Sequence, residues 1–88
     1  MVSAKGLVRN KLGVHARTAV TIVNTVSRFR SEVYFLKDDM KVSAKSILGV
    51  MMLEAGPGSE LTLEAEGTDE EQAMQALLAL FEAKFGED

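Results

Sequence analysis

The stretch Glu60-Leu61-Thr62-Leu63-Glu64-Ala65-Glu66 alternates strictly between polar and apolar residues, and the segment after it changes to a helical period. Alternation of this kind predicts a β-strand with one face in water. The following apolar residues share one face of a predicted helix: Met74, Leu77, Leu78, Phe81 and Phe85. A half-polar strand followed by an amphipathic helix predicts a two-layer α+β fold, with helices covering one side of an antiparallel sheet.

Capping residues indicate where two of the helices begin. Thr68 is expected to start the last helix, because Glu71 lies three residues later and the pair has the spacing of a capping box. Ser46 is expected to cap a shorter helix over residues 47–53, which is apolar on every side. A domain of this size cannot bury all of that surface, so one face of the short helix should stay exposed.

The first half of the chain supplies the remaining elements. Residues 2–9 alternate imperfectly as a strand, and from Ala16 a stripe with the period of a helix runs to residue 26. Residues 31–43 predict a hairpin that turns at Asp38-Asp39, and Gly56-Pro57-Gly58 suits a type II turn. The predicted element order is therefore βαββαβα.

Composition excludes several classes of function. The length of 88 residues predicts one domain over residues 1–88. The 13 acidic and 10 basic residues give a net charge of -3, whereas nucleic-acid binders usually carry a positive net charge. The chain has no cysteine and one histidine, so disulfides, thiolate chemistry and a zinc site are not expected. No segment has the ~18 apolar residues of a membrane span or the apolar core of a signal peptide. We therefore expect a soluble, cytoplasmic protein that does not insert into membranes.

The single histidine, His15, stands directly before the first predicted helix, in Leu12-Gly13-Val14-His15-Ala16-Arg17. A neutral imidazole nitrogen can attack phosphorus, and the backbone N–H groups at a helix start stabilise phosphate. Arg17 adds a guanidinium that fits phosphate oxygens. We therefore predict that His15 holds a phosphoryl group, with Arg17 and the backbone amides near Ala16 and Arg17 as its cradle.

Other interpretations of the charged residues and of His15 stay open at this point. A lone histidine is commonly a surface or partly packed residue without chemistry. Acidic residues at 38–39 and 69–71 could be acid/base or metal pairs, but neighbours in a strand point apart, and helix starts favour anions. Five basic residues could form a cationic patch near the site, although scattered surface charges are the simpler interpretation for the last two: Arg9, Lys11, Arg17, Arg28 and Arg30.

The element around His15, together with Lys45-Ser46-Ile47-Leu48-Gly49-Val50-Met51 downstream, resembles the HPr family of the bacterial phosphoenolpyruvate-dependent sugar phosphotransferase system. The likeness spans essentially the whole chain. It implies an open-faced β-sandwich, a four-stranded antiparallel sheet covered on one side by three helices. It also implies a phosphocarrier, not an autonomous enzyme, that needs no cofactor.

In that family, His15 would accept phosphate at Nδ1 from phosphorylated Enzyme I and pass it to an Enzyme IIA domain, with Arg17 steadying the phosphate. The serine matching Ser46 is a regulatory phosphorylation site in many bacteria, which would add a serine kinase/phosphorylase and a transcriptional regulator as partners. Phosphate at a helix N-cap is favoured by the helix dipole.

An exposed apolar surface for docking these partners is expected beside His15. Methionine suits a surface that must fit several partners. The predicted members of this docking patch are Leu12, Ala16, Val20, Ile47, Leu48 and Met51. Val50 and Ile47 could instead belong to the core.

The chain departs from the family pattern at one position, because proline usually follows the arginine where this chain has Thr18. Threonine should leave the site less rigid but add a hydrogen-bond donor. Residues 10–13 and 79–88 look like the nitrogen-related paralogue, whereas residues 46–49 look like the sugar-branch type. The alternative function is a regulatory protein-binding module switched by phosphorylation without a relay role, and a ferredoxin-like nucleic-acid binder fails on charge.

Overall fold

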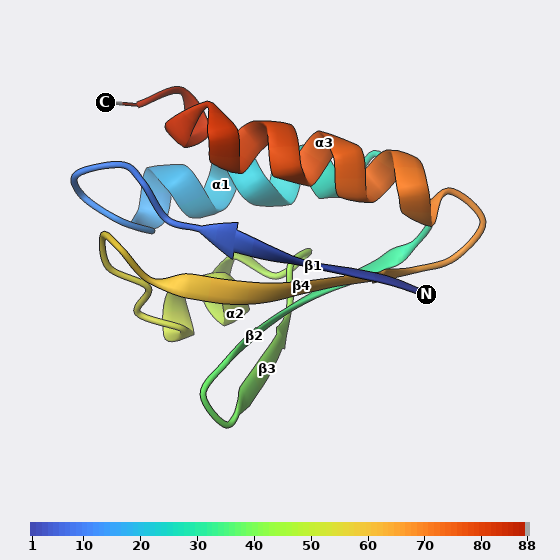
Figure 1. Ribbon diagram of the computed structural model, residues 1–88, viewed down its shortest axis with the longest axis horizontal. Helices are drawn as coiled ribbons and strands as arrows, with labels where there is room; N and C mark the ends of the chain where they lie inside the picture. Colours follow the sequence, from blue (N-terminus) through green and yellow to red (C-terminus); the bar gives the residue numbers. More distant parts are fainter. Residues whose placement is uncertain (88) are drawn as a thin grey trace.

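A four-stranded antiparallel sheet with helices on one side forms the fold (Figure 1), in a computed structural model that describes residues 1–87. The strands are β1 (Val2–Leu7), β2 (Glu32–Lys37), β3 (Met40–Ser43) and β4 (Glu60–Glu66). The helices are α1 (Ala16–Val26), α2 (Ile47–Met52) and α3 (Glu70–Glu82), followed by a 3-10 turn, η1 (Lys84–Gly86). The predicted order βαββαβα and the open-faced sandwich are confirmed.

Strand β4 lies in the middle of the sheet, whose order is β1-β4-β2-β3. Its alternating pattern has the predicted consequence, because Leu61, Leu63 and Ala65 are buried while the residues between them face away from the core. Leu63 pairs with Ala4 on β1 and with Phe35 on β2, so the centre of the sheet presents a continuous apolar face to the helices.

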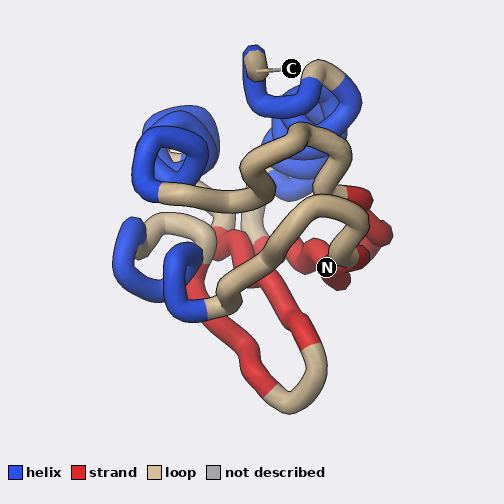
Figure 2. Tube along the Cα trace, turned by 90° about the vertical axis from the view of Figure 1, so that its left-hand side faces the viewer, coloured by secondary structure: helices blue, strands red, loops and turns tan. Residues whose placement is uncertain are grey.

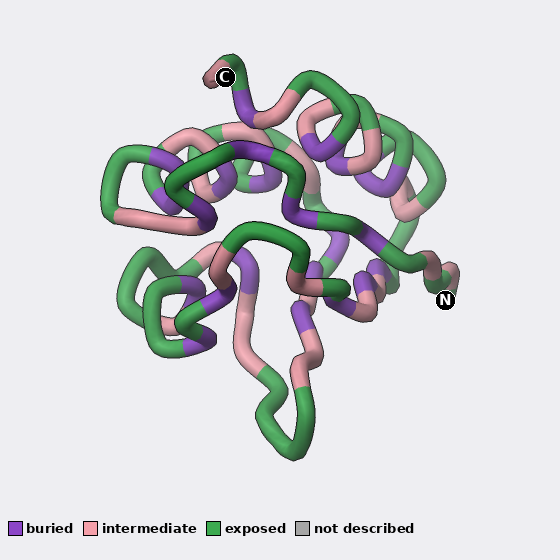
Figure 3. Tube along the Cα trace, turned by 60° about the vertical axis from the view of Figure 1, so that its left-hand side comes forward, coloured by how far each residue is buried: buried purple, intermediate pink, exposed green. Residues whose placement is uncertain are grey.

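Helices α1 and α3 pack across that face, and α2 lies beside α1 (Figure 2). The Phe81 ring of α3 meets Phe35 edge-on at 6.0 Å between ring centroids. A Cβ atom added at Gly6 would lie 2.9 Å from Phe81 Cε2, so glycine at this position lets α3 approach β1 closely. The inner surfaces of helices and sheet are buried, and the outer surfaces are exposed (Figure 3).

The predicted start of the last helix is wrong. Helix α3 begins at Glu70, with Asp69 at the N-cap position, and Thr68 is an exposed turn residue before it. The Glu70 carboxylate accepts a hydrogen bond from the Gly67 backbone N–H at 3.1 Å, so no Thr68–Glu71 capping box forms.

Long-range contacts explain why Asp69 does not cap its own helix. Its carboxylate turns towards the segment before β2 and accepts hydrogen bonds from the backbone N–H groups of Arg30 and Ser31, each at 2.9 Å. The Ser31 hydroxyl donates to the same carboxylate. This hydrogen bonding, from Ser31 first and then Arg30, lowers the pKa of Asp69 to about 2.

Two other local predictions are confirmed. The Ser46 hydroxyl accepts a hydrogen bond from the Gly49 backbone N–H at 3.0 Å and so caps α2. Gly58 has a φ of 86°, and the Ser59 N–H donates to the Gly56 carbonyl at 3.1 Å, as a type II turn requires. Within residues 1–87, no helix has the length and hydropathy that crossing a membrane would take.

Candidate functional site

The loop before α1 is fixed by the turn that precedes β4. Val14 N–H donates to the Ala55 carbonyl at 2.8 Å, and Val8 N–H donates to the Ser59 carbonyl at the same distance. Gly13 has a φ of 68°, and a Cβ atom there would lie 2.7 Å from the Ala55 oxygen, so only glycine fits. These contacts fix the backbone of the loop, so the position of His15 at the start of α1 is well defined.

His15 occupies the N-cap position of α1, with an extended backbone and no side-chain cap on the helix. Its carbonyl accepts the first intrahelical bond, from the Ala19 N–H at 2.8 Å. The N–H groups of the first helical turn have no intrahelical acceptor and carry the positive end of the helix dipole. The structure thus places His15 next to the free backbone amides at the start of α1, which include those of Ala16 and Arg17.

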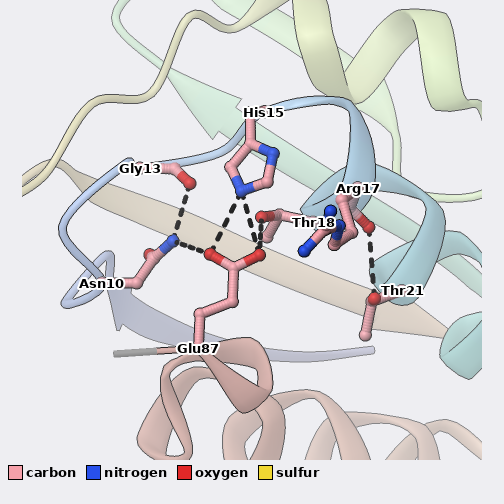
Figure 4. Close-up of polar contacts among 7 residues, drawn as sticks. All are labelled: Asn10, Gly13, His15, Arg17, Thr18, Thr21 and Glu87. Atoms are coloured by element: carbon pink, nitrogen blue, oxygen red, sulfur yellow. Dashed lines mark hydrogen bonds and ion pairs between the residues drawn. The ribbon is translucent and has the colours of Figure 1, made fainter.

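A carboxylate that the sequence did not reveal contacts the ring (Figure 4). His15 Nε2 lies 2.9 Å and 3.1 Å from the two carboxylate oxygens of Glu87, at the other end of the chain. Both side chains are partly buried. The hydrogen bond from His15 is the main cause that lowers the pKa of Glu87, so this group is a carboxylate at neutral pH.

Two further donors hold the Glu87 carboxylate. Asn10 Nδ2 donates to Oε1 at 2.8 Å and also to the Gly13 carbonyl at 2.8 Å. The opposite amide orientation would point Oδ1 of Asn10 at two acceptors, so its partners fix the amide as it stands. The Thr18 hydroxyl donates to Oε2 of Glu87 at 3.1 Å, and Thr18 is completely buried. The donor expected from threonine at this position is therefore present.

The second ring nitrogen, Nδ1, points towards the start of α1, where Arg17 lies (Figure 4). Arg17 is exposed, and its side chain lines an open pocket of about 710 Å³ together with Lys11, Leu12, His15, Gly86 and Glu87. Two cations thus line the same pocket as the ring, and the pocket has room for a tetrahedral anion.

The other basic residues lie elsewhere. Arg9 Nη1 is 3.3 Å from Glu82 Oε1, which makes it part of a surface ion pair with α3. Arg28 and Arg30 follow the C-terminal end of α1, the opposite end of the helix from His15. Of the five basic residues considered, only Lys11 and Arg17 line the pocket.

All six residues of the docking patch are exposed at the surface. Leu48 is the most exposed member on α2, at 71%, and Leu12 in the β1–α1 loop is exposed to 74%. Ile47 is also exposed, whereas Val50 is fully buried in the core. Helices α1 and α2 contact each other, and Ala16 and Val20 are the exposed members of the patch on α1.

The acidic residues considered as acid/base or metal pairs lie in a turn or at the start of a helix. Asp38 and Asp39 are exposed in the β2–β3 turn, and Asp69 and Glu70 bind backbone N–H groups around the start of α3. Residues 1–87 contain no group of three or more histidine, aspartate or glutamate side chains that could together hold a metal ion.

Sequence reasoning missed Asn10 and Glu87. Asn10 lies within residues 10–13, for which the sequence predicted no contact with His15. Glu87 is 72 residues from His15, and no periodicity links the two. The one available signal is Gly86, since a glycine after a last helix commonly marks a reversal of the chain.

Comparisons with known proteins agree on one family. The family model described as "PTS HPr component phosphorylation site" matches residues 2–83. Phosphocarrier protein HPr of Cupriavidus necator is 51% identical over 78 residues, covering 89% of this chain and 88% of the relative. Phosphocarrier protein NPr of Shewanella violacea is 44% identical, covering 89% of this chain and 86% of the relative. The crystal structure of HPr-C-His from Thermoanaerobacter tengcongensis superposes with a TM-score of 0.96 and 46% identity, covering 100% of this chain and 99% of that one.

Proposed function

The chain belongs to the HPr family of the phosphotransferase system, and from this premise we propose that it accepts a phosphoryl group on His15 from phosphorylated Enzyme I and passes it to an Enzyme IIA domain. Phosphocarriers of this kind are relay substrates that turn over with their partners. The proposal includes Arg17 as a phosphate ligand and Ser46 as a regulatory site.

One observation carries the proposal, namely that the two ring nitrogens of His15 have different surroundings. Nε2 is engaged by Glu87 at 2.9 Å, and Nδ1 points to the start of α1 (Figure 4). A carboxylate can only accept, so its partner nitrogen carries the ring proton and the lone pair lies on Nδ1. The nucleophilic nitrogen is therefore the one beside the helix N-terminus and Arg17.

In the transfer step, the Nδ1 lone pair forms a bond to phosphorus. The bond between phosphorus and the donor atom of Enzyme I breaks, and its electron pair leaves with the donor. The ring keeps its proton on Nε2 and gains positive charge, which the Glu87 carboxylate compensates from the far side. The backbone amides at Ala16 and Arg17 and the Arg17 guanidinium bind the phosphoryl oxygens. Transfer to Enzyme IIA runs the same steps in reverse.

The docking patch is the surface we assign to both partners. Leu12 lines the pocket of His15, and we assign the exposed apolar side chains of α1 and α2 to the same contact area for Enzyme I and Enzyme IIA. Ser46 stands at its border, exposed, with its hydroxyl on the Gly49 N–H at 3.0 Å. A phosphate on Ser46 would add negative charge next to the patch without opposing the helix dipole.

The same border position of Ser46 favours a second candidate function, a regulatory module that binds a partner only when Ser46 is phosphorylated. This module would need the patch but not His15. Binding to a transcriptional regulator that requires phosphorylated Ser46 and survives His15→Ala would support it.

Phosphorylation with Enzyme I, magnesium and phosphoenolpyruvate tests the relay. We expect intact-mass analysis to show one added phosphate that mild acid removes, because phosphoramidates are acid-labile. His15→Ala should lose this phosphate completely while its circular dichroism stays native.

Ser46→Ala is the matched control, and it should keep the acid-labile phosphate. A wild-type chain that stays unmodified with a competent Enzyme I, or a label that survives His15→Ala, would contradict the relay.

A further inference from the structure

Thr18 is a buried threonine with a single polar contact of consequence. Its hydroxyl donates to Oε2 of Glu87 at 3.1 Å, and the same oxygen lies 2.9 Å from His15 Nε2. Thr18 has no exposed surface, whereas its neighbour Arg17 is exposed. The hydroxyl therefore reaches the site through Glu87 and does not meet the solvent or the pocket directly.

The Glu87 carboxylate has donors around both oxygens. Asn10 Nδ2 approaches Oε1 at 2.8 Å, Thr18 approaches Oε2, and His15 Nε2 lies between the two oxygens. With one fixed donor on each side, the plane of the carboxylate is set, and both of its oxygens face the ring as acceptors. Loss of either side donor would let the carboxylate rotate away from Nε2.

The backbone before Glu87 is held in an uncommon conformation. Lys84, Phe85 and Gly86 all have positive φ, at 54°, 57° and 79°. Two of these three residues are not glycine, and such residues persist in this region only where the surroundings hold them. The buried Phe85 ring packs on Phe81 at 4.8 Å between centroids and supplies that hold. Residues 84–86 are thus held where Glu87 meets His15 and Thr18.

We propose that Thr18 is a positioning residue, whose hydroxyl orients Glu87 and through it keeps the proton of His15 on Nε2 and the lone pair on Nδ1. The inference rests on the proposed relay, because it concerns how the nucleophile is prepared. It is a property of this chain, since the proline that usually stands here in the family pattern has no hydroxyl.

The test compares Thr18→Val, which keeps the branched shape but removes the hydroxyl, with Thr18→Ser, which keeps the hydroxyl. Long-range ¹H–¹⁵N NMR of the His15 ring, recorded where the imidazole is neutral, reports which nitrogen carries the proton. We expect the Nε2–H form to dominate in the wild type and in Thr18→Ser. In Thr18→Val, we expect a measurable shift towards the Nδ1–H form and a several-fold slower phosphorylation by Enzyme I.

Thr18→Pro provides a second variant without the hydroxyl, because proline is tolerated in the first turn of a helix. It should show the same shift towards the Nδ1–H form. If Thr18→Val does not fold, Thr18→Pro takes its place in the test. Unchanged Nε2–H populations in a folded variant that lacks the hydroxyl would overturn the proposal. The NMR readout needs no Enzyme I, so failure of the relay would appear separately, as a wild-type chain that takes up no phosphate.

Discussion

Glu87 sits at the centre of the site at the scale of single residues, and its charge is open to a direct test. Glu87→Gln keeps an oxygen that can accept from His15 Nε2 but removes the negative charge opposite the ring. In the proposed transfer step the ring gains positive charge as the Nδ1–phosphorus bond forms. We therefore expect phosphorylation to slow on the order of tenfold, a small effect for an electrostatic contact because the pair is partly exposed.

Rapid-quench phosphorylation by Enzyme I measures the effect of Glu87→Gln. Glu82→Gln is the matched control, because Glu82 pairs with the exposed Arg9 at 3.3 Å, outside the His15 pocket, and should leave the rate unchanged. An equal rate in Glu87→Gln and the wild type would show that the carboxylate orients the ring without stabilising its charge.

These residues also show where sequence reasoning reached the site and where it stopped. His15 and Arg17 lie within one short segment at a helix start, so local chemistry predicted their meeting. Glu87 meets His15 at the end of a segment in which Phe85 packs on Phe81 and the backbone turns through positive φ. Tertiary packing decides that contact, and no local pattern encodes it.

At the scale of elements, the start of α3 illustrates the same competition. The Thr68–Glu71 spacing predicted a cap, but Asp69 instead binds the segment before β2 through Arg30 and Ser31. The strands and the stripes of α1 and α3 were predictable because burial follows their periods. Helix boundaries depend on partners far away in the sequence, and here a long-range contact displaced the local one.

The Asp69 contact predicts a pH dependence of stability. Hydrogen bonds from Ser31 and Arg30 lower the pKa of Asp69 from 3.8 to about 2, so the folded state binds this proton less readily than the unfolded state. The contact therefore stabilises the fold fully above pH 3.8, and its contribution disappears as the pH falls from 3.8 to about 2. Asp69→Asn should unfold at lower urea concentration at neutral pH and lose part of the acid dependence.

Urea unfolding followed across this pH range separates the two effects. Asp39→Asn serves as control, because Asp39 is exposed in the β2–β3 turn. If Asp69→Asn keeps the wild-type dependence on pH, the Asp69 contact does not couple proton binding to folding.

The cap of α2 predicts how a charge on Ser46 would act. Ser46→Asp keeps a side-chain oxygen for the Gly49 N–H, so α2 should remain intact, as judged by circular dichroism. The new charge lies beside the docking patch, so we expect weaker binding to an acidic partner at low salt and a smaller difference at high salt.

Titration calorimetry with an acidic Enzyme IIA domain measures the Ser46→Asp effect. Thr68→Asp adds the same charge in the exposed β4–α3 turn, away from α2, and should bind as the wild type does (Figure 1). Equal affinities for Ser46→Asp and the wild type at low salt would remove the electrostatic basis for regulation at this residue.

On the scale of the whole molecule, helices cover one face of the sheet and leave the other face open (Figure 1). The helices bury one face of the sheet and bring α2, the β1–α1 loop and the end of the chain around His15 (Figures 1 and 2). Leu48 and Leu7 are both exposed leucines, at 71% and 48%, but Leu48 lies in the docking patch and Leu7 lies at the end of β1, outside the patch. Leu48→Gln should therefore weaken binding to Enzyme I by roughly tenfold, as expected for a moderate interface contact of about 1.4 kcal/mol, while Leu7→Gln should not.

Both variants should retain their thermal midpoints, because exposed substitutions change stability by at most about 0.5 kcal/mol. Calorimetric titration of both variants with Enzyme I decides the matter, since equal affinities would place the docking surface elsewhere on the molecule.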